Sequence, residues 1–141
     1  MKELGIFLLN HWLLFLALVI VLTLIVMNTA RFSLLGFKEL QPADAVRLMN
    51  DRDVLVLDVR EQDEFSSGHI IHARHVPVAQ LTERVSELDA FRQQPVVVYC
   101  RTGQRAARAA ALLKKQGFSE IYKLNGGIMS WQGAGLPLEK G

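Results

Sequence analysis

The segment 95-PVVVYCRTGQRAARAAALLKKQG-117 joins an apolar run to an alanine-rich run and decides the fold class. Residues 95–99 are mostly valine, and such a run predicts a parallel strand that is buried on both faces. Residues 105–116 predict a helix, because two lysines occupy the last turn and Gly117 follows as a C-terminal cap. A strand followed directly by a helix is the repeating unit of α/β proteins. The chain's single cysteine, Cys100, lies between the two elements.

The same alternation of strands and helices extends to both sides of this segment. Residues 54–59 (VLVLDV) form a second β-branched run, and Pro42 suits the first turn of a helix. The further expected elements are a helix over 42–50, a weaker strand over 75–78, a helix over 81–88, a strand over 121–124 and a short helix over 126–131. We therefore predict an α/β fold with a mostly parallel sheet flanked by helices.

The N-terminal part of the chain has a different composition from the rest. Residues 4–27 contain no Asp, Glu, Lys or Arg. As a helix they would be about 36 Å long, which is enough to cross a hydrocarbon core of about 30 Å. Trp12 near the start of this run suits the aromatic belt of a membrane interface. We expect residues 4–27 to cross a lipid bilayer as a permanent anchor.

A cleaved signal peptide is the alternative interpretation of this run. It fits less well, because Lys2 is offset by Glu3, the apolar core is long, and residues 28–30 match a cleavage site poorly. More positive charge follows the run, starting with Arg31 and Lys38, than precedes it, and this favours a cytoplasmic C-terminal domain. The expected location is an inner or plasma membrane, crossed once.

Three parts of the chain are thus expected: an anchor over 1–30, a linker over 31–36 and an α/β domain over 37–141. A single cysteine excludes an internal disulfide framework and a cysteine-rich zinc site. The net charge of +2 and the lack of a basic run give no reason to expect nucleic acid as a partner. Three histidines recur between residues 69 and 75, but they straddle a turn without a completing thiol or carboxylate, so we expect no metal site.

Cys100 is the leading candidate for a reactive group, because ligands bind where parallel strands end beside helix N-termini. If the loop 100–105 curls at Gly103, several N–H groups converge on the sulfur. The helix N-terminus, Arg101 and Arg105 add positive potential, and all of these effects stabilise a thiolate over a thiol. An arbitrary lone cysteine is more often a small buried apolar residue. This position instead favours a nucleophile whose incoming partner is an anion.

Two further charged residues, Asp58 and Arg60, close the predicted strand over 54–59 and should lie at the same sheet edge as Cys100. Arg60 could add positive potential to the site. We favour the other interpretation, in which Asp58 and Arg60 pair with each other and fix the neighbouring loops. Arg108 lies one turn further along the helix and is expected on a solvated face.

Four stretches of the chain resemble the single-domain rhodanese family of sulfurtransferases, and together they span residues 37–138 in family order. They are LDVR at 57–60 with EF at 64–65, GHI at 68–70, CRTGQR at 100–105, and NGGI at 125–128 continuing through Trp131 to GLP at 135–137. One departure is IHA at 71–73, where the family usually has PGA, and this should change the backbone of that turn.

The resemblance implies a rhodanese-like fold and a sulfur-transfer mechanism without a cofactor. In it the Cys100 thiolate takes sulfur from a small anionic donor such as thiosulfate, and passes it from a persulfide to a thiol or protein persulfide acceptor. The residues implied to bind the donor are those of the loop after the cysteine: Arg101, Thr102, Gly103, Gln104 and Arg105. Asp58 and Arg60 are implied to support the site.

Loop length separates two chemistries in this superfamily. Sulfurtransferases use a six-residue loop that begins at the cysteine, whereas related phosphatases use a longer loop that fits a tetrahedral oxyanion. Cys100 and Arg105 have the C-x4-R spacing, so the resemblance favours sulfur transfer over phosphatase activity. The main alternative is a binding or scaffold module that recruits a partner at the membrane with little catalysis, and the intact cysteine loop favours the enzyme.

Overall fold

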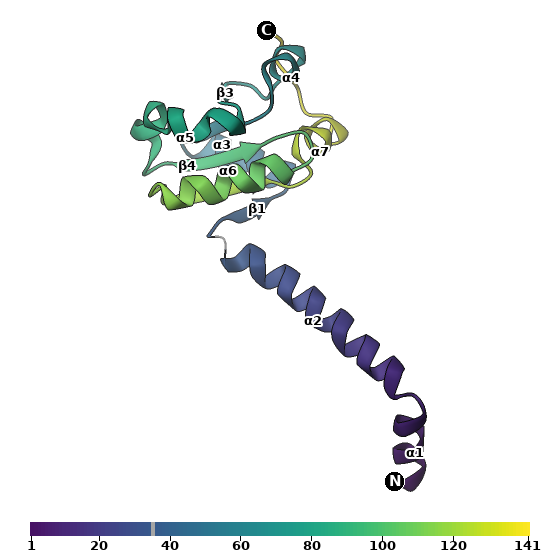
Figure 1. Ribbon diagram of the computed structural model, residues 1–141. Helices are drawn as coiled ribbons and strands as arrows, with labels where there is room; N and C mark the ends of the chain where they lie inside the picture. The colour runs from purple at the N-terminus through teal and green to yellow at the C-terminus, as the bar shows by residue number, and fades with distance from the viewer. Residues whose placement is uncertain (35) are drawn as a thin grey trace. The chain divides into compact units, whose positions relative to one another are not determined.

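The computed structural model describes residues 1–34, without the side chains of 31–34, and residues 36–141. The chain divides into two compact units, Met1–Leu34 and Leu35–Gly141. The first consists of helices α1 and α2, and the second contains the sheet with its flanking helices (Figure 1).

The first unit is a pair of consecutive helices, α1 (Lys2–Asn10) and α2 (Trp12–Leu34). A single helix was expected over 4–27, but His11 interrupts it with φ −120°. The stretch Trp12–Ala30 has a mean hydropathy of 2.7 and is long and apolar enough to cross a membrane, a property that signal sequences share. Helix α2 continues to Leu34, into the part expected as a linker, because the first glycine or proline after residue 5 is Gly36.

The second unit is built on a five-stranded, all-parallel sheet in the order β1-β5-β4-β2-β3. The strands are β1 (Lys38–Leu40), β2 (Leu55–Asp58), β3 (Arg74–His75), β4 (Pro95–Tyr99) and β5 (Glu120–Leu124). Strands β2 and β4 are buried along their whole length, as their valine- and leucine-rich runs predict. The prediction of an α/β fold with a parallel sheet is therefore confirmed.

Helices cover both faces of the sheet and make two separate hydrophobic clusters. The helices are α3 (Pro42–Asp51), α4 (Gln62–Ser67), α5 (Leu81–Arg84), α6 (Gln104–Lys115) and α7 (Gly127–Gly133), with 3₁₀ turns at Val78–Gln80 and Val85–Phe91. Val96, Val98 and Cys100 pack on the face covered by α5 and α6. Val97 and Tyr99 pack on the other face, against α3 and α7. This alternation follows from the two-residue period of a strand.

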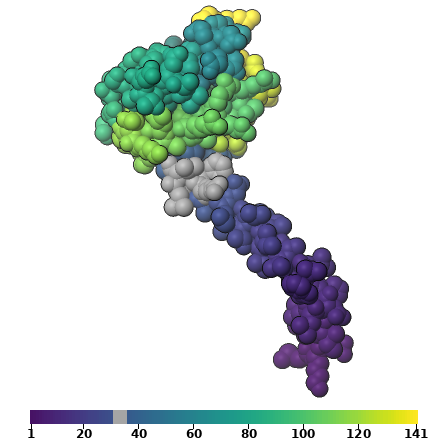
Figure 2. All heavy atoms as spheres, viewed as in Figure 1, coloured from purple at the N-terminus to yellow at the C-terminus, as the bar shows by residue number. Residues whose placement is uncertain are grey.

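Some local predictions differ from the structure. The helix expected over 81–88 is a single α-helical turn followed by a 3₁₀ segment, and the strand expected over 75–78 is the two-residue strand β3. Strand β1 and helix α4 were not predicted. The C-terminal residues lie against α4 (Figure 2), where Gly141 N–H donates to Ser66 O at 3.2 Å and His69 pairs with Glu139 in a bridge.

Candidate active site

Cys100 follows strand β4 directly, and its thiol is enclosed by the loop that leads into α6. The residue is 1% exposed. Its Sγ accepts the backbone N–H of Gly103 at 3.1 Å and that of Ala106 at 3.4 Å. Ala106 lies in the first turn of α6, so one donor comes from the loop and the other from the helix N-terminus. Two N–H groups, one of them at a helix N-terminus, therefore converge on the sulfur.

Gly103 and the first turn of α7 hold the loop in this shape. Gly103 caps α6 with φ +128°, a conformation that residues with a Cβ rarely adopt. Behind the loop, Ile128 N–H donates to Cys100 O at 2.9 Å and Met129 N–H donates to Arg101 O at 3.2 Å. The first turn of α7 therefore donates hydrogen bonds to two carbonyls of the cysteine loop and fixes the position of the loop.

Asp58 and Arg60 pair at the same sheet edge, as favoured from the sequence. Arg60 Nη2 donates to Asp58 Oδ2 at 2.7 Å, and Arg60 Nε lies 3.1 Å from both carboxylate oxygens. The pair is buried, and Arg60 Nη2 also donates to Gly68 O at 2.7 Å. The arginine thereby ties the end of α4 to strand β2. Burial of Tyr99 beside this pair raises the pKa of its phenol far above the ordinary value.

Arg105, expected to bind the donor, pairs with Glu64, which the sequence analysis named as part of a family motif without giving it a role. Its Nη1 lies 2.7 Å from Glu64 Oε2 and its Nη2 lies 2.9 Å from Glu64 Oε1. Glu64 Oε2 also accepts the N–H of Glu61 at 2.9 Å, which closes a capping box at the start of α4. The hydrogen bonds from Arg105, opposed by desolvation, lower the pKa of Glu64 to about 2.

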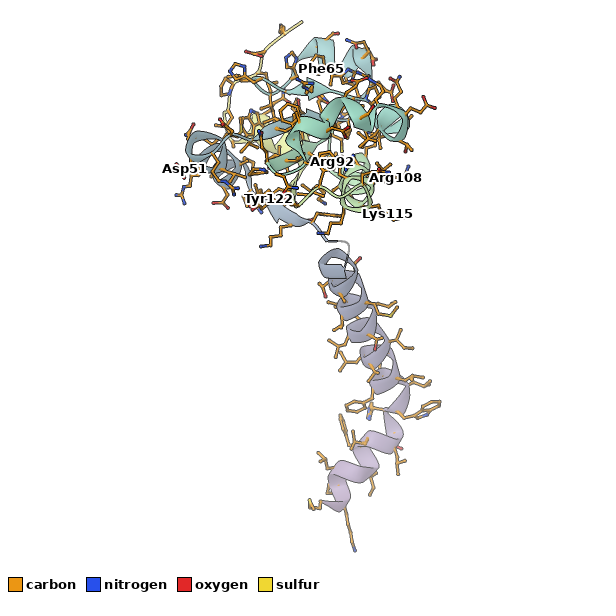
Figure 3. All side chains as sticks on the ribbon, turned by 90° about the vertical axis from the view of Figure 1, so that its left-hand side faces the viewer. Asp51, Phe65, Arg92, Arg108, Lys115 and Tyr122 are labelled. Atoms are coloured by element: carbon orange, nitrogen blue, oxygen red, sulfur yellow. The ribbon has the colours of Figure 1, made fainter. Side chains whose placement is uncertain are left out.

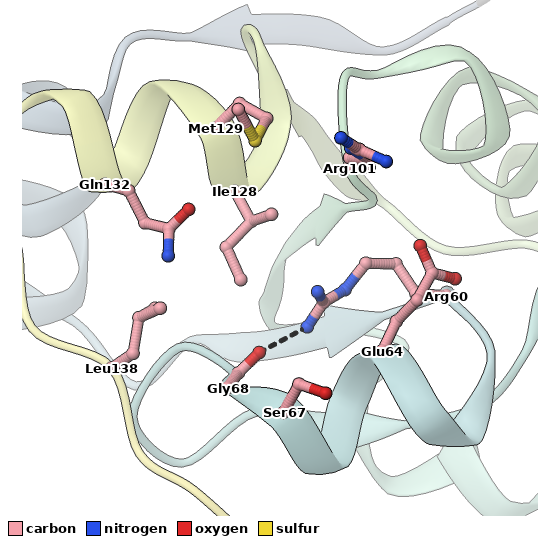
Figure 4. A pocket seen from close by; sticks show the side chains of 9 residues that line it. All are labelled: Arg60, Glu64, Ser67, Gly68, Arg101, Ile128, Met129, Gln132 and Leu138. Carbon is pink, nitrogen blue, oxygen red and sulfur yellow. Dashed lines mark hydrogen bonds between the residues drawn. The ribbon is translucent and has the colours of Figure 1, made fainter.

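A pocket of about 280 Å³ adjoins the loop (Figure 4). Its lining residues are Arg60, Glu64, Ser67, Gly68, Arg101, Ile128, Met129, Gln132 and Leu138. Charged side chains gather on one side of it in Figure 4, and the side chains from α7 together with Leu138 gather on the other.

The structure gives the expected loop residues different surroundings. Arg101 is exposed and lines the pocket. Thr102 and Gln104 are exposed, Gly103 supplies an N–H group to the sulfur, and Arg105 is paired. Arg108 is exposed on α6 (Figure 3).

The α7 side of the pocket was not predicted as part of the site. Ile128, Met129 and Gln132 follow the glycines of the NGGI stretch, and Met129 is the large apolar residue most open to solvent in the described part of the second unit, at 50% exposure. The sequence held no separate signal for these side chains, because the exposure of Met129 is known only once the fold places it. These residues are distant from Cys100 along the chain, so only the fold shows that they lie beside the cysteine loop.

The histidines near the pocket pack against Phe65 and do not converge. The Phe65 ring stacks on His69 at 3.9 Å and on His75 at 4.6 Å between centroids. His72 is exposed and has φ 62°, the left-handed conformation that glycine adopts most easily. This is the middle residue of the IHA turn, so a histidine takes the strained position where the resembling family usually has glycine.

Comparisons with known proteins agree with this fold and site. A family model described as a rhodanese-like domain matches residues 41–134. The chain is 36% identical over 96 residues to the thiosulfate sulfurtransferase GlpE of Coxiella burnetii, covering 68% of this chain and 88% of that protein. The solved structure of a rhodanese-related protein from Thermoplasma volcanium superposes with a TM-score of 0.66 and 31% identity, covering 73% of this chain and 98% of that one.

Two uncharacterised bacterial proteins are also similar. YibN of Escherichia coli K12 is 30% identical over 142 residues, and the match covers 100% of this chain and 99% of that protein. YqhL of Bacillus subtilis is 44% identical over 82 residues, which are 58% of this chain. The match spans 64% of the length of YqhL.

Proposed function

The chain belongs to the rhodanese family, and from that membership we propose that it is a sulfurtransferase in which Cys100 carries a sulfur atom as a persulfide. One observation carries the proposal: Cys100 directly follows a buried strand, and its Sγ accepts two N–H groups, at 3.1 and 3.4 Å. Such donors stabilise the thiolate that begins the transfer and that is regenerated when the acceptor takes the outer sulfur.

The reaction proceeds in two displacements. The Cys100 thiolate attacks the outer sulfur of an anionic donor such as thiosulfate. The sulfur–sulfur bond of the donor breaks, a new one forms on Cys100, and sulfite leaves with the electron pair. A thiolate on a small molecule or on a protein then attacks the outer sulfur of the persulfide and regenerates the Cys100 thiolate. Each step exchanges one sulfur–sulfur bond for another, so the electrons balance without an external oxidant.

The loop residues divide these tasks. Gly103 donates an N–H to the sulfur, and Arg101 lines the pocket beside the loop, where the donor would bind. Thr102 and Gln104 are exposed and can contact a bound donor or acceptor. Asp58 and Arg60 support the site by holding the Gly68 carbonyl at its rim.

The proposed place of reaction is a membrane surface. The apolar stretch Trp12–Ala30 would anchor the domain in the bilayer. Inside this stretch Thr23 Oγ1 donates to Val19 O at 2.7 Å, so its hydroxyl has a partner within its own helix, as a lipid environment requires. The charge bias around the anchor favours a cytoplasmic domain, and reducing conditions in the cytoplasm would supply acceptor thiols.

Intact-mass analysis of the full-length protein in detergent tests the transfer step. After treatment with thiosulfate, the wild-type protein should gain the mass of one sulfur atom, and cyanide or dithiothreitol should remove it. The Cys100→Ser variant should gain none. Release of sulfite, measured in the same samples, should match the added mass.

An unmodified wild-type protein with unchanged Cys100 would contradict the enzyme and leave a binding or scaffold role. Addition of sulfur to the serine variant would also contradict it, because the chain has no other thiol.

A further inference from the structure

The three arginines nearest the site differ in whether their charge is balanced. Arg60 is held by the buried carboxylate of Asp58 at 2.7 Å. Arg105 is held in two-point contact by Glu64. Arg101 is exposed, and no ion pair is found for it among the residues that the structure describes. Arg101 is therefore the arginine whose charge remains available to a ligand in the pocket.

Glu64 is fixed in place on the charged side of the pocket. Its carboxylate accepts from the Arg105 guanidinium and from the Glu61 N–H, and its side chain is 28% exposed. Glu64 lines the pocket in Figure 4, whereas Arg105 is not among the lining residues. Glu64 thus pairs with the Arg105 guanidinium. The pocket is lined by the negative Glu64 and not by the positive Arg105.

The net charge that a ligand meets follows from these pairs. Asp58 balances Arg60 and Glu64 balances Arg105, so of these three arginines only Arg101 keeps an unbalanced positive charge for a donor that approaches the Cys100 thiolate. A donor with one negative charge is balanced by this arginine, while a donor with two keeps one charge uncompensated beside Glu64.

The shape of the pocket agrees with its charge. Ile128, Met129 and Leu138 line the side opposite the charged groups. The volume of about 280 Å³ is close to the lower end for pockets that hold organic ligands. An apolar wall of this kind suits an organic substituent on the donor.

We propose that Glu64 is a positioning and selectivity residue, which holds Arg105 and makes the site prefer a monoanionic organic sulfur donor over dianionic thiosulfate. This inference rests on the proposed sulfurtransferase function. For an organic thiosulfonate the step is the same displacement: the Cys100 thiolate takes the outer sulfur, the donor's sulfur–sulfur bond breaks, and a sulfinate leaves with the electron pair.

The test compares thiosulfate with benzenethiosulfonate as donors for the full-length protein in detergent. Wild type should have the higher kcat/KM with benzenethiosulfonate. Glu64→Gln should raise kcat/KM for thiosulfate relative to benzenethiosulfonate by about threefold to tenfold, mainly through KM, because one negative charge leaves the pocket. Glutamine can still complete the capping box, so the fold of α4 should persist. Added salt should reduce the change.

Two variants accompany this measurement. Asp63→Asn removes the same charge from an exposed neighbour on α4 and should leave the ratio unchanged. Arg101→Gln should raise KM for both donors, and more for thiosulfate, while the persulfide still forms at high donor concentration.

The outcomes separate this inference from the proposed function. If wild type takes sulfur from neither donor, the proposed function fails and this inference fails with it. If wild type takes sulfur but prefers thiosulfate, or if Glu64→Gln changes both donors by the same factor, the sulfurtransferase stands and the selectivity role of Glu64 is overturned. An equal change for both donors is what a purely structural role would give.

Discussion

Gly127 is the residue on which the back of the cysteine loop depends. A Cβ at this position would lie 2.5 Å from the carbonyl oxygens of both Cys100 and Arg101, and its φ is +60°. Both contacts are with backbone, which cannot turn away as a side chain could. The absence of a side chain here is what lets α7 donate hydrogen bonds to the loop.

We predict that Gly127→Ala lowers the free energy of unfolding by about 2–3 kcal/mol, because it adds a backbone clash to an unfavourable φ. It should also slow persulfide formation, since the loop must move. Denaturant unfolding and the rate of mass gain with thiosulfate measure the two effects. The control is Gly133→Ala in the same helix, where a Cβ would meet nothing within 4 Å and stability should hold or rise slightly. Equal behaviour of the two variants would contradict the prediction.

Helix α4 has only six residues and contacts the start of α6 through the pair of Glu64 with Arg105. Its stability depends on the capping box between Glu61 and Glu64 and on the pairing of Glu64 with Arg105 across 41 positions of the chain. The pKa of Glu64 in the folded protein is about 2, below the ordinary 4.5. A carboxyl with a depressed pKa contributes stability above its unfolded pKa, and loses that contribution as the pH falls toward the folded value.

The resulting prediction concerns acid stability. At pH 7, Glu64→Gln should reduce the free energy of unfolding by about 1–2 kcal/mol, allowing for solvent screening of a partly exposed pair. The difference from wild type should shrink below pH 4.5 and nearly vanish near pH 2. Denaturant titrations across that range measure it, with Asp63→Asn as the control. A difference that stays constant with pH would show that the ion pair is not its source.

The helices and strands that could be predicted from the sequence are those whose own residues carry a local signal, such as an apolar run or a helix cap. The valine run of β4, the alanine-rich α6 and its glycine cap all lie where expected, because burial on both faces and helix capping are local signals. Helix α4 lacks an apolar stripe, and the glutamate at its N-cap is not among the usual capping residues. Strand β1 has only three residues, two of them exposed. Pairing with β5, which no local pattern reveals, makes it a strand.

The same contrast holds for the candidate site. Cys100 and its loop could be predicted because the thiol lies between a strand and a helix. The pairing of Asp58 with Arg60 could be predicted because both lie at the end of a strand. The partnership of Glu64 with Arg105 and the α7 side of the pocket depend on how distant segments pack. The charge of Arg105, for which the sequence shows no neighbouring partner, is thus balanced by Glu64 in the folded protein.

At the scale of the whole molecule, the chain consists of an apolar helical unit and an α/β unit that has its own two hydrophobic clusters. Trp12–Ala30 shows no burial within the structure. So much exposed apolar surface needs an apolar environment.

The proposed topology predicts which end of the chain is accessible from outside the cell. In a Cys100→Ser background, a cysteine replacing Lys2 should react with a membrane-impermeant maleimide in intact cells. A cysteine replacing the exposed Lys140 should react only after the membrane is opened. The reverse pattern would place the domain outside the cytoplasm, and release of Lys140→Cys into the soluble fraction would indicate a cleaved signal peptide.

The parallel register of the sheet has a consequence for how such a domain can be used. Because all strands are parallel, the chain enters the sheet at the N-terminal end of β1, whereas Cys100 follows the C-terminal end of β4. The residues that lead into the sheet are therefore not those that form the cysteine loop. Exchanging the first 35 residues for a soluble carrier should change how often the thiol meets its partners, because the proposed confinement to a membrane surface is replaced by free diffusion. The intrinsic rate of the displacement should be unaffected.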